Sequence, residues 1–349
     1  MQFTGTLPRA LVHRAAVAEV FLTDAERQGS DEVLLAAQLP RLHPFYDDTL
    51  GPRSHHAPFL LLEACRQGLF VVSHRYLGVP MDHKFLLRTV EFQVTDPAAL
   101  AHGDSPAEVV IGAHIEHRPS SRSGLTGRRL CFTAAVGGRE ALQAGIDYSW
   151  MPPEDWQRLR SGQRDALGLP GRPVALSVPR IDPALVDRRD PANAVISPSR
   201  ATGDGGRTAR LVVDTTHPTL FDHWVDHVPG MLELEGLWQL ALVASVDAGT
   251  VDGPAALPVA LSARFRRFAE MDLPLECRTA PVRPGADVEC TLHQPGALVA
   301  EARIRLADRN STGPGGVFAS PEHALAPTPV SEGRARRAES SPRPAPAHV

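Results

Sequence analysis

Two stretches of this chain place a glutamate and a glutamine four residues apart in an otherwise apolar segment, Glu63 with Gln67 and Glu235 with Gln239. Residues four apart lie on one face of a helix, and a helix that is apolar nearly all round is buried. A buried carboxylate is costly unless it is paired or used in chemistry. Burial also raises the pKa of a carboxyl group toward the working pH, which suits a general base. We therefore expect Glu63 and Glu235 to be catalytic candidates.

A structural role competes with catalysis for both glutamates. Each carboxylate could be hydrogen-bonded to its own glutamine or to an arginine such as Arg66, which interrupts the first apolar helix. Arg66 could equally bind a phosphate group. Duplication of a domain followed by decay of one copy would also leave the pair twice, so one of the two sites need not be active.

The residues that precede each helix could supply the rest of an acyl-transfer site. His55 and His227 lie just before the two helices, and we expect them to be the next catalytic candidates if the glutamates are not the base. Backbone N–H groups at a helix start are unpaired and positively polarised, and Gly230 has no side chain to keep a thioester carbonyl away from them. Pro58, at the start of the first helix, lacks an N–H, so the two halves are not equivalent. The candidate substrate-binding residues are Arg66, Gln67, Gly230 and Gln239.

Neither a metal site nor a cofactor is expected from the spacing of ligand residues. His223 and His227 have metal-like spacing but no obvious third ligand, and the four cysteines show no Cys-x-x-Cys pair. We expect the cysteines to be small buried residues in a reducing cytoplasm.

Composition limits the class of protein. The chain has 349 residues, 43% of them apolar, and a formal net charge of −4, so it can build two ordinary domains. A small net charge without a basic pole argues against a nucleic-acid or anionic-membrane partner. No signal peptide is apparent, and the two apolar helices are too short and too polar to span a bilayer. These features favour a cytoplasmic protein that acts on small molecules.

The two helices belong to a repeated α+β unit. In the first half, strands are expected at Glu32 to Leu39, Phe85 to Val94, Ala107 to Glu116 and Arg128 to Val136, around a helix at Pro58 to Tyr76. The second half repeats this order, so we expect a tandem pair of units whose sheets join side by side. The predicted limits are a first unit at 1–160, a linker at 161–173, a second unit at 174–306 and a disordered tail at 307–349.

The buried helix with Pro-Gly at its start and Glu-x-x-x-Gln inside resembles the hotdog fold of acyl-thioester enzymes. The stretch from His227 to Glu235 is similar to the signature of the β-hydroxyacyl-carrier-protein dehydratases, although its part before Pro229 is shortened. The tandem as a whole is closer to the A-factor biosynthesis family of actinomycetes, the AfsA-type γ-butyrolactone synthases. The matching features are Val12-His13-Arg14, Val20-Phe-Leu-Thr-Asp24, His43-Pro44, Glu63-x-x-Arg66-Gln67, Asp226-His-Val-Pro-Gly-Met231 and Phe265-Arg-Arg-Phe268.

This resemblance implies a tandem hotdog fold and an acyltransferase. Such enzymes move a β-ketoacyl group from an acyl-carrier-protein or CoA thioester to a hydroxyl of dihydroxyacetone phosphate, toward a γ-butyrolactone-type or furan-like signalling molecule that controls secondary metabolism. In this fold class the carboxylate of one half commonly faces the helix start of the other, which would set Glu63, Arg66 and Gln67 opposite His227 and Gly230. The chain would act as a monomeric pseudo-dimer or as a homodimer. A hotdog dehydratase or thioesterase, and a non-catalytic acyl-binding regulatory protein, stay as alternatives.

Overall fold

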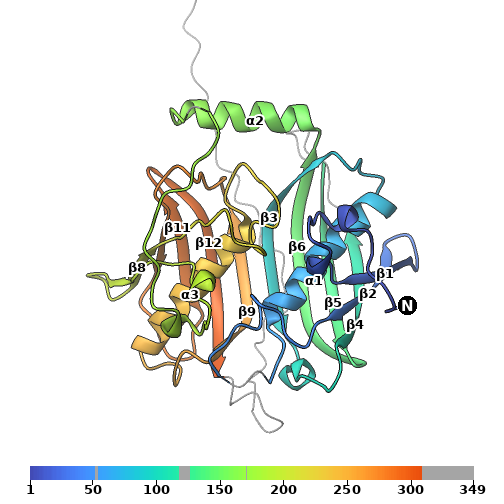
Figure 1. Cartoon of the computed structure of the whole chain (residues 1–349), viewed down its shortest axis with the longest axis horizontal. Coiled ribbons are helices and arrows are strands. Elements are labelled where there is room, and N and C mark those ends of the chain that lie inside the picture. Colours follow the sequence, from blue (N-terminus) through green and yellow to red (C-terminus); the bar gives the residue numbers. More distant parts are fainter. Residues whose placement is uncertain (52–53, 118–125, 170, 309–349) are drawn as a thin grey trace, which may run out of the picture. The chain divides into compact units, whose positions relative to one another are not determined.

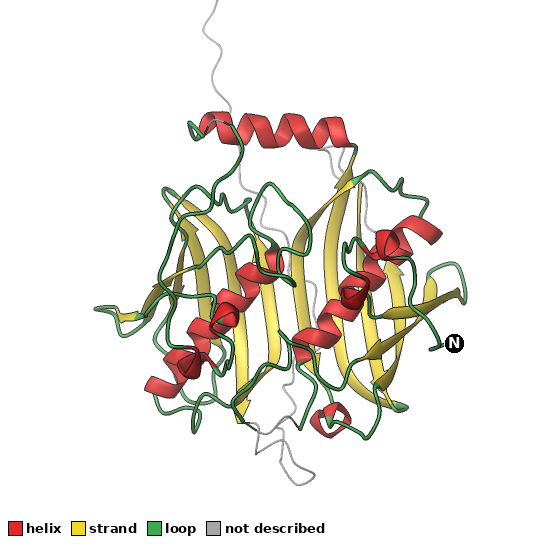
Figure 2. Ribbon diagram, viewed as in Figure 1, coloured by secondary structure: helices red, strands yellow, loops and turns green. Residues whose placement is uncertain are grey.

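The computed structural model describes residues 1–51, 54–117, 126–169 and 171–308. Each half consists of one long helix lying on a curved antiparallel sheet (Figure 2). This arrangement confirms the predicted α+β tandem. The helices are buried because nearly every side chain in them is apolar, and the strands alternate buried and exposed residues as a sheet with one covered face requires.

The first half contains β1 (Leu22–Arg27), β2 (Glu32–Leu39), α1 (Pro58–Val71), β3 (Lys84–Val94), β4 (Ala107–Glu116), β5 (Thr126–Val136) and β6 (Arg139–Met151). A π-helical turn, Val72–Tyr76, extends α1, so the helix predicted at Pro58 to Tyr76 has the expected limits. The strands β1 and β6 are not among those predicted for the first half. Short 3₁₀ turns lie at Arg9–Val12, Val17–Glu19, Pro97–Leu100, Pro183–Val186 and Pro191–Asn193.

The second half contains β7 (Arg200–Ala201), β8 (Arg207–Arg210), α3 (Gly230–Asp247), β9 (Ala256–Phe265), β10 (Glu276–Thr279), β11 (Val288–Gln294) and β12 (Ala297–Asp308). The strands of both halves form one sheet in the order β1-β2-β4-β5-β6-β3-β9-β12-β11-β10-β8-β7, and all the strand pairs are antiparallel. Read outward from the centre of the sheet, the strands of the two halves follow one another in the same order.

The halves join through β3 and β9, where Thr89 pairs with Arg264 and Gln93 with Ala260 (Figure 1). Joining the sheets here removes the strand edge that each half would otherwise expose. The helices α1 and α3 lie on the same face of the joined sheet, one on each side of this junction.

A further helix, α2 (Pro153–Ala166), connects the halves and runs through the limit predicted between the first unit, 1–160, and the linker, 161–173. Its start has Pro153 at the first position and acidic residues in the first turn, as helix starts favour. Hydrophobic periodicity did not reveal α2 because its buried face consists of Trp156, Arg160 and Arg164 instead of aliphatic residues.

At the other end of the second unit, β12 continues to Asp308, two residues beyond the predicted limit at 306. The rest of the tail predicted to be disordered, 309–349, lies outside the described residues. Within the described part of the chain, no helix is long and apolar enough to cross a membrane.

Candidate active site

A cavity of about 1160 Å³ lies over the junction of the two halves. Its lining comes from the lead-in segment 9–15, from α1, from β3, from α2, from the loop 219–228 and from the first turn of α3. Of the residues proposed from the sequence, Arg66, His227 and Gly230 line this cavity. Glu63, Gln67, Glu235, Gln239 and His55 are not among its lining residues.

His227 is hydrogen-bonded to its neighbour Asp226, with Nδ1 and Oδ1 2.7 Å apart. Burial alone would raise the pKa of Asp226, but the hydrogen bond from His227 and the charge of Arg160 outweigh it and hold the pKa at about 2. An ionised carboxylate only accepts hydrogen bonds, so Nδ1 of His227 carries the proton and Nε2 is left able to accept one. This is the orientation that a general base requires.

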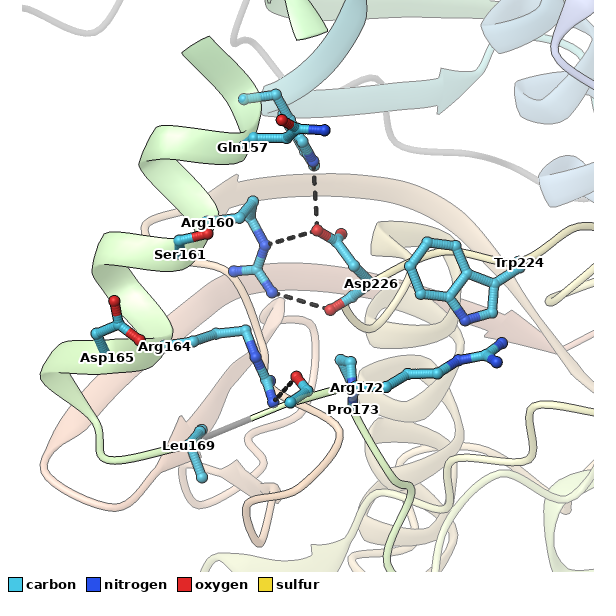
Figure 3. Close-up of a pocket in the computed structure, with 12 residues that line it drawn as sticks. Gln157, Arg160, Ser161, Arg164, Asp165, Leu169, Arg172, Pro173, Trp224 and Asp226 are labelled. Carbon is cyan, nitrogen blue, oxygen red and sulfur yellow. Dashed lines mark hydrogen bonds and ion pairs between the residues drawn. The ribbon is translucent and has the colours of Figure 1, made fainter. Parts of the chain in front are cut away.

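The linker helix α2 holds Asp226 in place (Figure 3). Arg160 donates from Nε to Oδ2 of Asp226 at 3.2 Å and from Nη2 to its backbone carbonyl at 2.9 Å, and it also contacts Glu270 at 2.7 Å. The indole of Trp156 donates to the same Oδ2 at 3.3 Å. Phe268 packs edge-on against the His227 ring, with centroids 5.0 Å apart. The His227 side chain is therefore fixed from several sides.

Glu233, which is not part of the repeated Glu-x-x-x-Gln pair, is a buried acid on this cavity. It is 3% exposed, and within the described residues its Oε2 has no hydrogen-bond partner. Because burial is not offset by any nearby cation, the pKa of Glu233 is raised well above its ordinary value. Residues 233 and 235 point to different faces of α3, so the acid that reaches the cavity is not the one repeated in α1.

Replacing Glu233 by methionine should stabilise the fold by about 1–3 kcal/mol, because an unsatisfied buried polar group is removed. The raised pKa makes the wild-type protein lose stability as pH rises above the unfolded value near 4.5. The advantage of Glu233→Met should therefore grow between pH 5 and pH 8 in urea denaturation. Glu154→Met, an exposed change on α2, is the control and should alter stability by less than about 0.5 kcal/mol. A Glu233→Met variant less stable than wild type at both pH values would contradict this assignment.

The start of α3 provides N–H groups beside His227. A Cβ at Gly230 would lie 3.2 Å from the ring of Phe265 and 3.4 Å from the side chain of Leu87, both of which line the cavity. Glycine at this position therefore keeps the first turn of α3 accessible. The N–H groups of Leu232 and Glu233 already donate to the carbonyl of Pro229. Those of Gly230 and Met231, which carry partial positive charge at the helix start, are the ones that can bind an oxyanion.

Glu63 is fully buried and accepts hydrogen bonds from two arginines. Arg14 donates to Oε1 at 2.5 Å, and Arg66 donates to both oxygens at 2.6 and 2.9 Å. Burial alone would raise the pKa of Glu63, as the sequence analysis expected, but the charges of Arg14 and Arg66 outweigh it and lower the pKa to about 2. Such a carboxylate is a weak base. It is suited to holding two cavity-lining arginines in place.

Gln67 and Gln239 form hydrogen bonds to main-chain groups, one in each half of the molecule. Gln67 donates to Glu63 at 3.0 Å, and Gln239 donates to Glu235 at 2.7 Å. The carbonyl oxygen of Gln67 accepts from the backbone N–H of Phe21, and that of Gln239 from Val195. Both glutamines thus fasten the segment that leads into their own half.

The second glutamate repeats this arrangement with one arginine. Arg188 donates to Glu235 at 2.5 Å and to the backbone carbonyl of Asp48 in the first half at 3.0 Å. Arg14 likewise reaches across to the carbonyl of Thr219 at 3.1 Å. The repeated pair therefore joins the two halves. The sequence contains both arginines at repeated positions, which was the available signal for this role.

Positive charge dominates the cavity wall. Within the described residues, the acidic lining residues are Asp222, Asp226 and Glu233. The cationic lining residues are Arg9, Arg14, Arg66, Lys84, Arg88, Arg266 and Arg267. Such a wall favours an anionic ligand.

His55 lies elsewhere, where it forms an isolated bridge with Ala101 and contacts Ser54.

Comparison with known proteins agrees with this architecture. The model of the A-factor biosynthesis hotdog domain matches residues 1–151 and 173–307. A 2-oxo-3-(phosphooxy)propyl 3-oxoalkanoate synthase from Streptomyces virginiae is 34% identical over 304 residues, which cover 85% of this chain and 96% of that protein. A synthase of the same name from Streptomyces coelicolor is 32% identical over 301 residues, covering 84% and 89%.

Among solved structures, a 12:0-ACP thioesterase from Umbellularia californica matches with a TM-score of 0.45 and 13% identity, over 81% of this chain and 99% of that one. The family model spans both halves of the chain, and the relatives match over nearly their whole length. The chain therefore belongs to the A-factor biosynthesis hotdog family.

Proposed function

We propose that this chain transfers a 3-oxoacyl group from a thioester of an acyl carrier protein or coenzyme A to a hydroxyl of dihydroxyacetone phosphate. The name of the relatives describes the expected product, an ester of a 3-oxoalkanoate with a phosphorylated 2-oxopropyl group. The observation that carries the proposal is the Asp226–His227 pair beside the open start of α3, in a cavity with a cationic wall.

In the proposed reaction, Nε2 of His227 accepts the proton of the acceptor hydroxyl while its oxygen attacks the thioester carbonyl. N–H groups in the first turn of α3, which Gly230 leaves accessible, stabilise the negative oxygen of the tetrahedral intermediate. When this intermediate collapses, the carbon–sulfur bond breaks and the thiolate takes the proton back from His227. Neutral Glu233 can donate a hydrogen bond to a ketone oxygen of either substrate. The wall that includes Arg66 binds the phosphate.

Product analysis by mass spectrometry tests the proposal. A 3-oxoacyl thioester incubated with the protein and dihydroxyacetone phosphate should give a phosphorylated ester and a free thiol in equal amounts. Hydrolysis or loss of water at the same rate without dihydroxyacetone phosphate would instead support the thioesterase or dehydratase alternative. Binding of the thioester without any product would support a regulatory acyl-binding protein.

Arg66→Gln should raise the KM for dihydroxyacetone phosphate by about 10- to 100-fold, because a charged hydrogen bond is worth about 1.5–3 kcal/mol. The change in kcat should be smaller, since Arg66 contacts the phosphate and not the reacting atoms. Arg75→Gln, which alters an exposed arginine in the turn after α1, is the matched control. An unchanged KM for dihydroxyacetone phosphate in Arg66→Gln would place the phosphate elsewhere on the cationic wall.

A further inference from the structure

Two histidines and an aspartate converge away from the cavity, under the start of α1. One potential ligand atom from each of Asp47, His56 and His102 lies within 4.8 Å of those of the other two. His56 is 1% exposed and Asp47 is 4% exposed. The rings of His56 and His102 are in contact, with centroids 4.2 Å apart. His102 lies 46 residues after His56, which is why ligand spacing along the chain did not reveal the three residues together.

The backbone holds these side chains in position. The N–H of His56 donates to the carbonyl of Leu100 at 2.8 Å, and the N–H of His102 donates to the carbonyl of Ser54 at 2.8 Å. These two bonds fix the segment before α1 against the segment after the 3₁₀ turn Pro97–Leu100. Both histidines are therefore anchored by main-chain contacts that do not involve their rings. A site whose ligands are already anchored loses little conformational entropy when it binds an ion.

The chemical state of the cluster suits a transition metal. Within the described residues, the buried Nδ1 of His56 has no hydrogen-bond partner, an arrangement that native interiors usually avoid. Asp47 accepts hydrogen bonds from the backbone N–H of His43 at 2.8 Å and of Ala57 at 3.4 Å. Carboxylate ligands of metals are commonly oriented by such bonds.

We propose that Asp47, His56 and His102 bind one zinc-like divalent transition-metal ion. Two imidazoles and one carboxylate are ligands that zinc accepts, with an exogenous molecule in the fourth position. Ligand atoms about 2.0–2.1 Å from a tetrahedral ion lie roughly 3.3 Å apart, so the three side chains close slightly around it. The present separations are at most 4.8 Å.

The ion has a structural role, because none of its ligands lines the cavity. It clamps the segment that enters α1 to the segment that leaves the 3₁₀ turn at Pro97–Leu100. Asp47 also follows Tyr46, which does line the cavity, so the clamp supports the wall indirectly. The second half has Phe221 and Val228 at the positions that repeat Asp47 and His56. The site is therefore specific to the first half.

Metal analysis of the purified full-length chain tests the proposal. After dialysis against zinc and removal of free ion, wild-type protein should retain about one zinc per chain, and zinc should raise its Tm. Cobalt should bind to the metal-free protein with the intense visible absorption of a four-coordinate site. Wild-type protein that retains no zinc, shows no shift in Tm and gives no cobalt spectrum would overturn the proposal.

Variants locate the ion. His56→Gln and Asp47→Asn should each lower zinc retention at least about tenfold and abolish the shift in Tm, whereas His114→Gln, an exposed histidine on β4, should behave as wild type. If His56→Gln fails to fold, zinc retention by Asp47→Asn and the cobalt spectrum of the wild-type protein still test whether the ion binds at this site. Full retention of zinc by folded His56→Gln or Asp47→Asn would mean that the ion is bound elsewhere, and it would also overturn the proposal.

Discussion

His227→Asn is expected to lower the turnover of acyl transfer by about 10²- to 10⁴-fold, the usual contribution of a positioned general base. Asparagine fits the space of the ring but has no nitrogen that can accept a proton at neutral pH. The fold should be retained, because His227 is only partly buried and its neighbours are held by Arg160 and Trp156. Steady-state kinetics with a 3-oxoacyl thioester and dihydroxyacetone phosphate measure the effect.

Asp226→Asn provides a second test of the same pair. An asparagine can donate to Nδ1 of His227 and so favour the tautomer that carries its proton on Nε2, which cannot act as base. Turnover should again fall by about 10²-fold or more. The exposed His117→Asn variant is the control and should have wild-type kinetics. If both His227→Asn and Asp226→Asn kept near-wild-type turnover, this pair would not supply the base, and Glu233 would be the next candidate.

Glu63→Gln is expected to cost about 3 kcal/mol of stability or more, because breaking a buried ion pair leaves an uncompensated charge. Arg14 and Arg66 would both lose their carboxylate partner, and Arg14 is almost fully buried. Since both arginines line the cavity, activity should fall together with stability. Urea denaturation at pH 7 measures the stability change. Glu235→Gln is the matched comparison and should cost less, because only Arg188 loses its partner.

The pH dependence of stability distinguishes this role from general base catalysis. The folded pKa of Glu63 is lowered from 4.5 to about 2, so its stabilising contribution is fully present above pH 4.5 and is lost as pH falls toward 2. Wild-type protein should therefore lose stability between pH 5 and pH 3 more steeply than Glu63→Gln. Equal slopes for the two proteins, or a Glu63→Gln variant with full stability and no activity, would return Glu63 to the role of base.

The elements that carry strong local patterns were predictable from the sequence. The strands β2 and β4 and the α1 segment have the limits that their hydrophobic pattern and the turn residues around them predict. Each buries a set of side chains whose spacing can be recognised in the sequence. The helix α2 and the strand β6 were missed. The buried face of α2 contains Arg160 and Arg164, whose burial depends on acidic partners more than 100 residues away, Glu270 and Asp272.

In the candidate site, too, some features follow from local sequence and others depend on distant residues. Burial of Glu63 and Glu235 was predicted correctly, since it follows from the apolar residues around them in one helix. What their carboxylates do depends on Arg14 and Arg188, which come from segments 49 and 47 residues away. Burial raises the pKa of any carboxyl group, but the charges of arginines beside it can outweigh burial and lower the pKa. Glu63 and Glu233 illustrate both cases.

The sequence by itself determined the duplication, the apolar helices and the membership of His227 and Gly230 in one motif, because these depend on residue type and local spacing. Only the tertiary structure decided which acid reaches the cavity. Glu233 and Glu235 lie on different faces of α3, and the packing of α3 turns Glu235 toward Arg188 and Glu233 toward the cavity. The tertiary structure also decided that Asp47, His56 and His102 meet. Convergence of this kind depends on how distant segments pack, and sequence spacing does not encode it.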